Sequence, residues 1–279
     1  LTANTTGDNN VAVGKDAGKA ITTGVFNTFL GALSGDAHTV GYNNVAVGTN
    51  AMGSDVSSRA CTAIGSSALA TMNNTDTDAY NTAVGFAAGS LITTGIQNTL
   101  IGGLAGDAIT TGGNNTAVGM NALTANTTAS YNSAFGKSSL LSNTTGANNS
   151  AVGFGSLGNN TTASNNTAVG YSSLTANTTA SDNTSVGAGS MDDTTTGAFN
   201  SALGSEALGA NTTGASNVAV GVSALAANTT ASNNTAVGRD ALLANTTGYS
   251  NTAIGKDALA ATTTGNTNTA VGVDALTTN

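Results

Sequence analysis

A glycine recurs every 17 residues along this chain, each time at the end of a segment similar to Asn-Thr-Ala-Val-Gly. One step, from Gly65 to Gly85, is 20 residues long, and we expect residues 72–78 to form a bulged surface loop there. A fixed period over a full sequence is typical of solenoids and repeat arrays. We therefore predict that residues 1–279 form a single repeat array without a domain boundary or linker.

The repeat itself favours short β-strands over helices. Numbering 17 positions from its first Asn gives the consensus Asn-Thr-Ala-Val-Gly-x-x-Ala-Leu-x-Ala-Asn-Thr-Thr-Gly-x-Asn. The β-rich segment at positions 2 to 4 and the frequent Gly and Asn leave no apolar stripe of helical period. We predict an all-β fold, a parallel β-solenoid (β-roll) of sixteen 17-residue coils, in which each coil rises by roughly 4.8 Å.

Position 4 is apolar in all sixteen repeats, as at Val118 and Val237. We interpret this column as core, and because side chains alternate along a strand, position 2 is expected to face inward and position 3 outward. Position 3 is Ala in thirteen repeats, and position 8 is always Ala or Ser. Columns of such small residues allow another backbone to approach, so we predict that further copies of the chain pack on them.

A large side chain at position 9 in most repeats is replaced by a large side chain at position 12 in the others. Position 9 is Leu or Met in twelve repeats, as at Leu123 and Leu242, and Gly in the other four. In those four repeats the usual polar residue of position 12 becomes a larger one: Ile21, His38, Ile92 and Ile109. A coil without either side chain would contain a cavity of leucine size. We infer that both positions reach the same part of the core and that His38 has a packing role there.

Position 1 is Asn in fifteen of the sixteen repeats and Cys61 in the remaining one. Stacked Asn side chains hydrogen-bond along a column in cross-β assemblies, so we predict an amide ladder at position 1. Cys61 fits this column as a small guest, and since its own repeat contains no histidine we expect it to be structural rather than nucleophilic. The Gly of position 5 is expected at a corner of the coil.

Composition disfavours several classes of function. Lys and Arg number 6 against 14 Asp and Glu, and the resulting formal charge of −8 disfavours nucleic acid and anionic membrane as partners. The sequence contains no run of 18 apolar residues, so we expect no membrane insertion of this segment. A single Cys excludes an internal disulfide, and a single His leaves no catalytic constellation. We therefore predict that the protein is not an enzyme and uses no cofactor.

Three carboxylates form a weak candidate for a metal site. Asp240, Asp257 and Asp274 occupy position 7 of three consecutive repeats. Carboxylates about 5 Å apart in a column could bind a hard cation such as calcium. The alternative, which we favour, is a solvated column whose charge is reduced by the adjacent Arg239 and Lys256.

The Asn-Thr-Thr corners match the signal for N-glycosylation. The possible acceptors at position 12 are Asn126, Asn143, Asn160, Asn177, Asn211, Asn228 and Asn245, and a second corner adds Asn114, Asn165 and Asn233. An Asn- and Thr-rich turn that repeats produces such matches automatically, so each match is weak evidence for modification.

Three segments carry a resemblance to a known family. Asn-Asn-Val-Ala-Val-Gly (43–48), Asn-Asn-Thr-Ala-Val-Gly (114–119) and Asn-Thr-Ala-Ile-Gly (251–255) resemble the head repeats of YadA-like trimeric autotransporter adhesins, and similar repeats occur in phage tail-fibre-like proteins. The resemblance covers all 279 residues, although the 17-residue repeat is longer than is typical of the family. It implies a left-handed β-roll, a homotrimer around one axis and an extracellular attachment role.

We therefore expect an extracellular structural or adhesive fibre segment with a Thr- and Asn-rich surface, on a cell or a virion. Its expected partners are copies of itself, in a homotrimer or an end-to-end filament, and a host-surface protein or glycan. An ice-binding β-solenoid is one alternative, because flat Thr arrays can order water, and a phage tail-fibre shaft is another. The chain begins and stops partway through a repeat, so we expect it to be an excerpt of a longer polypeptide or one link of a filament.

Overall fold

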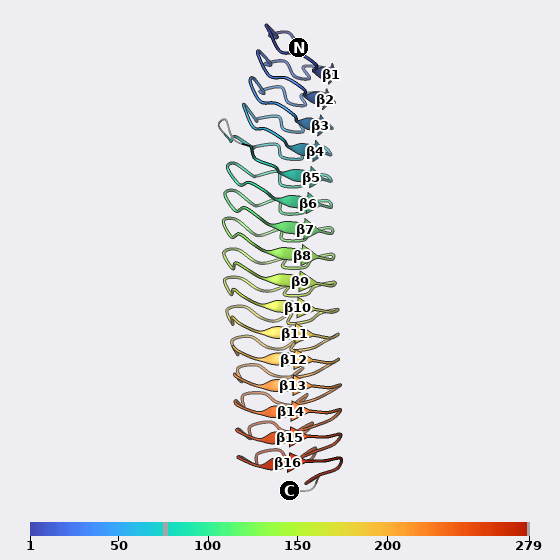
Figure 1. Ribbon diagram of the computed structural model, residues 1–279, viewed down its shortest axis with the longest axis vertical. Helices are drawn as coiled ribbons and strands as arrows, with labels where there is room; N and C mark the ends of the chain where they lie inside the picture. Colours follow the sequence, from blue (N-terminus) through green and yellow to red (C-terminus); the bar gives the residue numbers. More distant parts are fainter. Residues whose placement is uncertain (75–77, 278–279) are drawn as a thin grey trace. The chain divides into compact units, whose positions relative to one another are not determined.

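The computed structural model describes residues 1–74 and 78–277, in which short parallel strands alternate with turns (Figure 1). Internal contacts divide the chain into an N-terminal unit, residues 1–145, and a C-terminal unit, residues 146–279. Each unit is a parallel β-solenoid with one three-residue strand in every coil, and the described residues contain no helix. The all-β parallel solenoid predicted from the period is confirmed.

The strands recur once per repeat. The N-terminal unit contains β1 (Val11–Val13), β2 (Thr28–Leu30), β3 (Val45–Val47), β4 (Thr62–Ile64), β5 (Thr82–Val84), β6 (Thr99–Ile101), β7 (Thr116–Val118) and β8 (Ser133–Phe135). The C-terminal unit contains β9 (Ser150–Val152), β10 (Thr167–Val169), β11 (Thr184–Val186), β12 (Ser201–Leu203), β13 (Val218–Val220), β14 (Thr235–Val237), β15 (Thr252–Ile254) and β16 (Thr269–Val271). Each strand occupies positions 2 to 4 of its repeat.

Neighbouring strands within each unit pair in parallel, and every repeat position lies beside the same position of the next coil. Ala117 of β7 pairs with Ala134 of β8, for example, and Ala236 of β14 with Ala253 of β15. The 20-residue repeat keeps this register, because Ala63 of β4 pairs with Ala83 of β5. The surface loop predicted at 72–78 lies partly outside the described residues, which exclude 75–77.

The side chains of the strands point opposite to the prediction. Position 3 is buried in every coil except the first, whereas positions 2 and 4 are never buried. Val118 and Val237 therefore lie at the surface, and their assignment to the core is wrong. Positions 3 and 8 line the interior instead, as at Ala117 and Ala122, which have no exposed area. The prediction that these small-residue columns are a packing surface for other copies is also wrong.

The side chain of position 9 extends across the interior toward position 3, so little room is left for a large residue at position 3. A Cβ added to Gly35 would lie 2.5 Å from the Phe29 ring, and one added to Gly106 would lie 2.8 Å from Leu100. Phe29 and Leu100 are the large residues of position 3, and their own coils have Gly at position 9. Elsewhere Leu or Met at position 9 fills the same space, so position 3 is restricted to Ala or Ser.

The structure confirms that positions 9 and 12 share this core. A Cβ on Gly18 would lie 3.3 Å from Ile21 Cδ1, and one on Gly106 would lie 2.8 Å from Ile109 Cδ1. The isoleucines therefore reach the space that a position 9 side chain would occupy. The predicted core residues with no exposed area are Ile21, Ile92, Ile109, Leu123 and Leu242.

The amide ladder at position 1 is confirmed and has a backbone component. Asn98 Nδ2 donates to Asn81 Oδ1 at 3.1 Å, and the backbone N–H of Asn98 donates to the same oxygen at 3.0 Å. Asn98 Nδ2 also donates to the carbonyl of Gly112, across the turn of its own coil, at 3.0 Å. Each Asn therefore links two coils and closes a turn.

A second Asn column, at position 12, was not predicted. Asn228 Nδ2 donates to Asn211 Oδ1 at 2.9 Å and to the carbonyl of Ala231 at 3.1 Å. The Asn side chains of position 12, which are buried in seven coils, thus form a second ladder.

The glycine of position 5 is required by both conformation and space. Gly119 has a φ of +139°, and a Cβ there would lie 2.5 Å from the carbonyl oxygen of Gly136 in the next coil. A side chain at this corner would separate the coils, so the repeat tolerates only glycine.

Candidate functional site

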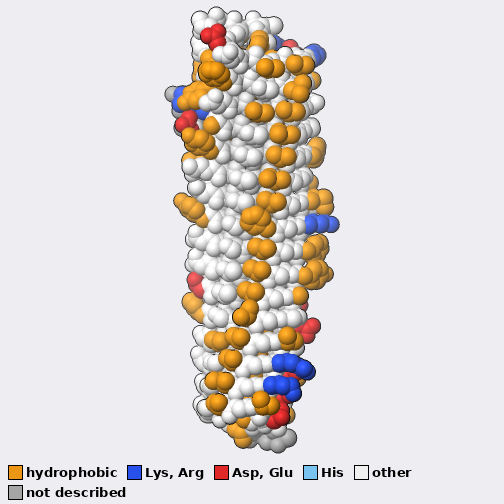
Figure 2. All heavy atoms as spheres, turned by 45° about the vertical axis from the view of Figure 1, so that its right-hand side comes forward, with side chains coloured by type: hydrophobic (Ala, Val, Ile, Leu, Met, Phe, Trp, Pro, Cys, Tyr) orange, Lys and Arg blue, Asp and Glu red, His pale blue; other side chains and the backbone are white. Residues whose placement is uncertain are grey.

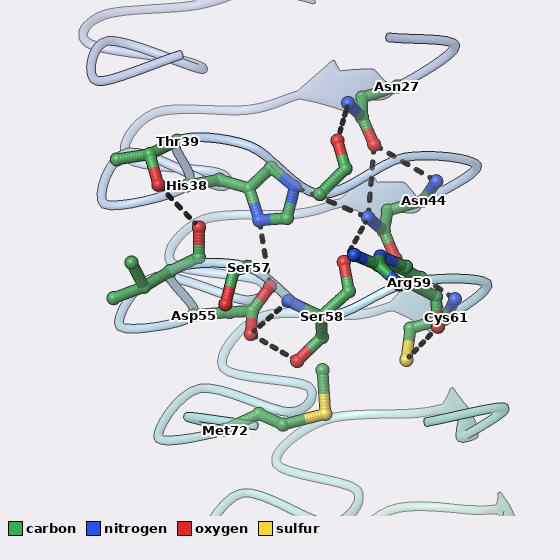
Figure 3. Close-up of polar contacts among 12 residues, drawn as sticks. Asn27, His38, Thr39, Asn44, Asp55, Ser57, Ser58, Arg59, Cys61 and Met72 are labelled. Atoms are coloured by element: carbon green, nitrogen blue, oxygen red, sulfur yellow. Dashed lines mark hydrogen bonds and ion pairs between the residues drawn. The ribbon is translucent and has the colours of Figure 1, made fainter. Parts of the chain in front are cut away.

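A fully buried polar cluster surrounds the single histidine, in the N-terminal unit (Figure 3). His38 Nδ1 lies 2.8 Å from Asp55 Oδ2. Ser58 donates to Asp55 Oδ1 through its hydroxyl and, at 3.3 Å, through its backbone N–H. His38 and Asp55 both occupy position 12, one coil apart, so the parallel stacking brings them together. All three side chains have no exposed area.

The cluster is joined to the Asn ladder of position 1. Asn44 Nδ2 lies 3.3 Å from His38 Nε2 and 3.0 Å from Asn27 Oδ1. An amide NH₂ only donates, so we assign Nε2 as the acceptor and place the ring proton on Nδ1, facing Asp55. The Asp55 carboxylate thereby accepts hydrogen bonds from His38 and Ser58, which offsets the cost of burying it.

This geometry favours a structural role over a catalytic one. The Ser58 hydroxyl donates to a carboxylate, whereas a nucleophilic serine needs a base that takes its proton. The pKa of the nearby Cys61 thiol is raised to about 12, mainly by burial. The hydrogen bond from the Asn81 backbone lowers this pKa, and the charge of Asp55 raises it. The thiol is therefore protonated at neutral pH and unreactive.

Comparing the repeats by bulk alone missed this cluster. His38 was expected to replace Ile as a packing residue, and it does lie in the core, against Phe29 with 5.5 Å between ring centroids. The 17-residue spacing between His38 and Asp55 indicated this partner, because residues 17 apart occupy the same position in consecutive coils. An Asp one repeat after a buried His predicts a contact between them.

The three aspartates proposed as calcium ligands do not converge. Arg239 Nε lies 2.8 Å from Asp240 Oδ2, and Lys256 Nζ lies 2.7 Å from Asp257 Oδ2, while Asp274 is exposed. Within residues 1–74 and 78–277, no group of at least three His, Cys, Asp or Glu side chains could hold a metal ion. The arrangement matches a solvated column with adjacent basic partners.

The seven glycosylation signals at position 12 are inaccessible. Asn126, Asn143, Asn160, Asn177, Asn211, Asn228 and Asn245 have no exposed area. Their amides hydrogen-bond inside the coil, as Asn126 Nδ2 does to the carbonyl of Ala129 at 3.0 Å. These possible acceptors are therefore not accessible for glycosylation in the folded chain. The three signals named at the second corner, Asn114, Asn165 and Asn233, are exposed.

The outward side of the strands carries a repeated apolar surface, which we call the strand face and define as positions 2 and 4 of each coil. Its exposed large residues at position 4 include Val13, Leu30, Ile64, Ile101 and Phe135 in the N-terminal unit and Val152, Leu203, Ile254 and Val271 in the C-terminal unit. Figure 2 shows exposed hydrophobic side chains arranged in columns over successive coils. Because soluble monomers rarely expose large contiguous apolar patches, the strand face is a candidate contact surface.

Comparisons with known proteins assign no family to this repeat protein. No protein-family model matches the chain, and no curated protein matches its sequence. The part of the chain that the structure describes contains no helix long and apolar enough to cross a membrane. The function must therefore be argued from the geometry of the solenoid itself.

Proposed function

We propose that the chain is a segment of an extracellular fibre, structural or adhesive, that assembles as a homotrimer. The strand face is the observation that carries this proposal, because it presents Val, Ile, Leu or Phe to solvent once in every coil. The resemblance to the heads of trimeric adhesins favours three copies around one axis and a left-handed roll. A cell surface and a virion are both locations that fit such a fibre.

The energetics favour covering this face. Burying a Val or Ile that is half exposed stabilises by about 1 kcal/mol. The gain repeats in each of the eight coils of a unit, and parallel register keeps the apolar side chains in line. Self-association along the strand face is therefore the expected source of additional stability, in place of the small-residue columns that the coil itself buries.

The corners remain available to a partner when the strand face is covered. The position 14 threonines are exposed in both units, as at Thr128, Thr179 and Thr213. With a net charge of −8, the surface favours neutral or basic partners over anionic ones. Attachment to a host-surface protein or glycan is the adhesive form of the proposal.

Measurement of mass in solution tests the assembly. We expect the native protein to have three times the chain mass of 26.7 kDa. The variant Val118→Lys/Val169→Lys/Val237→Lys should dissociate, since it places a charge on the strand face of both units. The control Thr128→Lys/Thr179→Lys/Thr247→Lys carries the same charges at exposed corners and should remain trimeric. A monomeric native protein would refute the trimer.

An ice-binding solenoid remains the second candidate, because the strand face also carries a row of threonine hydroxyl groups. Position 2 is Thr in four consecutive coils, beside the apolar residues of position 4: Thr62, Thr82, Thr99 and Thr116. By contrast, the position 13 hydroxyls bond within the chain, as Thr93 Oγ1 does to the carbonyl of Thr110 at 3.1 Å. Thermal hysteresis that disappears in the strand-face lysine variant would favour ice binding over the fibre.

A further inference from the structure

The surface of the C-terminal unit is hollowed across the coils of β10 to β13. The depression is open and has a volume of about 440 Å³. Its polar lining consists of Tyr171, Asp192, Ser205 and Glu206, and its floor includes Gly189 and Gly209. We call this feature the Tyr171 depression.

A loss of side-chain bulk in consecutive coils creates the depression. Position 6 is aromatic at Phe154 and Tyr171 and then falls to Ala188 and Ser205. Position 10 is Thr175 in the β10 coil but Gly209 in the β12 coil. The hollow therefore lies where these small residues follow Tyr171 along the stack.

One face of the Tyr171 ring is available to a ligand. Phe154, one coil earlier, stacks on Tyr171 with 5.5 Å between ring centroids and an interplanar angle of 11°. This spacing is close to one coil, so the rings stack along the column and the second face of Tyr171 is directed toward the coil of Ala188. Alanine leaves that face uncovered, and Tyr171 is 63% exposed. An open aromatic face of this kind stacks on the C–H face of a sugar ring or on another flat group.

The other side of the depression offers hydrogen-bond acceptors without a counter-charge. Asp192 Oδ1 lies 3.6 Å from the point that a Cβ on Gly209 would occupy, and Glu206 Cγ lies 3.8 Å from the corresponding point at Gly189. Burial raises the pKa of Asp192, and the neighbouring Asp193 and Glu206 raise it further. Among the residues that the structure describes, no basic side chain lines the hollow, so it repels anionic ligands.

We propose that the Tyr171 depression binds a neutral saccharide, whose ring stacks on Tyr171 and whose hydroxyls donate to Asp192 and Glu206. An aromatic platform beside a few convergent polar groups is the usual composition of a small-ligand site. The Ser205 hydroxyl is a further donor or acceptor. The site rests on the proposed adhesive function and supplies a ligand class for it, and a repeated subsite in an assembled fibre gains affinity by multivalency.

A glycan array carrying neutral oligomers of glucose, galactose and mannose, together with sialylated forms of the same glycans, tests the site. Tyr171→Ala removes the platform. Gly209→Thr fills the hollow with a residue that position 10 already holds at Thr175. The matched controls are Tyr249→Ala, an exposed tyrosine of the same unit, and Gly158→Thr, a position 10 glycine that does not line the hollow. Circular dichroism and the thermal midpoint verify that each variant folds.

We expect the native protein to retain neutral glycans in preference to their sialylated forms. Tyr171→Ala and Gly209→Thr should each weaken retention by about tenfold or more, and the controls should stay within about twofold of native. The site is refuted if the native protein retains no neutral glycan, or if both folded variants retain glycans as the native protein does. A monomeric native protein that still retains neutral glycans would refute the fibre assembly while supporting the site.

Discussion

His38 and Asp55 lie one coil apart inside the solenoid, with 2.8 Å between Nδ1 and Oδ2 and no exposed area on either side chain. Other coils place Ile, Asn, Met or Thr at this position. A buried polar pair of this kind is rarely more stable than well-packed apolar residues of similar volume, but loss of one partner leaves the other buried and unpaired. The two residues are therefore tolerated together and not separately.

Replacing one partner should cost far more than replacing both. We expect His38→Ile to lower the free energy of unfolding by about 3 to 5 kcal/mol, because Asp55 loses its imidazole donor. His38→Ile/Asp55→Asn should recover most of this loss, since Ile and Asn are residues that position 12 holds elsewhere. Urea unfolding of the native chain, both single variants and the double variant measures the coupling. If the double variant loses as much stability as the two single variants together, the pair is not coupled.

The largest error of the sequence-based prediction is the direction in which the strand side chains point. The period predicted the solenoid, and comparison of repeats predicted the ladder of position 1 and the shared core of positions 9 and 12. Position 4 was assigned to the core because it is apolar in every repeat, but the width of the interior is set by Leu or Met at position 9, which leaves room only for Ala or Ser at position 3. The evidence was present in the chain, because Phe29 and Leu100 occur only in coils with Gly at position 9.

The candidate site was predictable only in part, for a related reason. Asn126 matches a glycosylation signal because of the residues that follow it in the sequence. In the solenoid, however, it lies buried in a ladder formed with the same position of adjacent coils. The Tyr171 depression depends on what is missing from several coils at once. Such a hollow is visible only when the columns at positions 6, 7 and 10 are assembled in space.

Paired substitutions in β7 test the corrected orientation. Val118→Ala should cost at most about 1 kcal/mol of stability in the chain, because Val118 lies at the surface. Ala117→Val should cost about 1 to 3 kcal/mol, since it overpacks a residue with no exposed area. Urea unfolding at one protein concentration compares the two, and measurement of mass separates any effect on assembly. The reverse order of costs would restore the original assignment of the strand faces.

Substitutions at Leu123 test the shared core and the backbone together. Leu123 has a φ of 57°, in the left-handed region that glycine adopts without strain. Leu123→Ala should therefore destabilise by about 2 to 5 kcal/mol, and Leu123→Gly by about 1 kcal/mol less. Leu123→Gly/Asn126→Ile should recover part of the remaining loss, as in the coils that pair Gly with Ile. A double variant no more stable than Leu123→Gly would contradict the shared core, and thermal unfolding of all three variants decides it.

The buried thiol of Cys61 predicts a specific loss of stability at high pH. Burial, the largest cause, raises its pKa in the folded chain from the ordinary 9.0 to about 12. Below pH 9 the thiol is protonated in both states, and its contribution to stability is complete. Between pH 9 and 12 the unfolded chain releases this proton first, so the free energy of unfolding falls by up to about 1.4 kcal/mol per pH unit.

Cys61→Asn separates this effect from other groups that titrate in the same range. The variant restores the residue that position 1 holds in every other coil and has no thiol, whereas its tyrosines and lysines are unchanged. We expect the stability of the native chain to fall more steeply than that of Cys61→Asn from pH 9 to 12, as measured by urea unfolding at each pH. A thiol-specific reagent should label native Cys61 far more slowly than the urea-unfolded chain. Equal slopes for the two proteins, or rapid labelling of the folded chain, would show that the thiol is accessible to solvent.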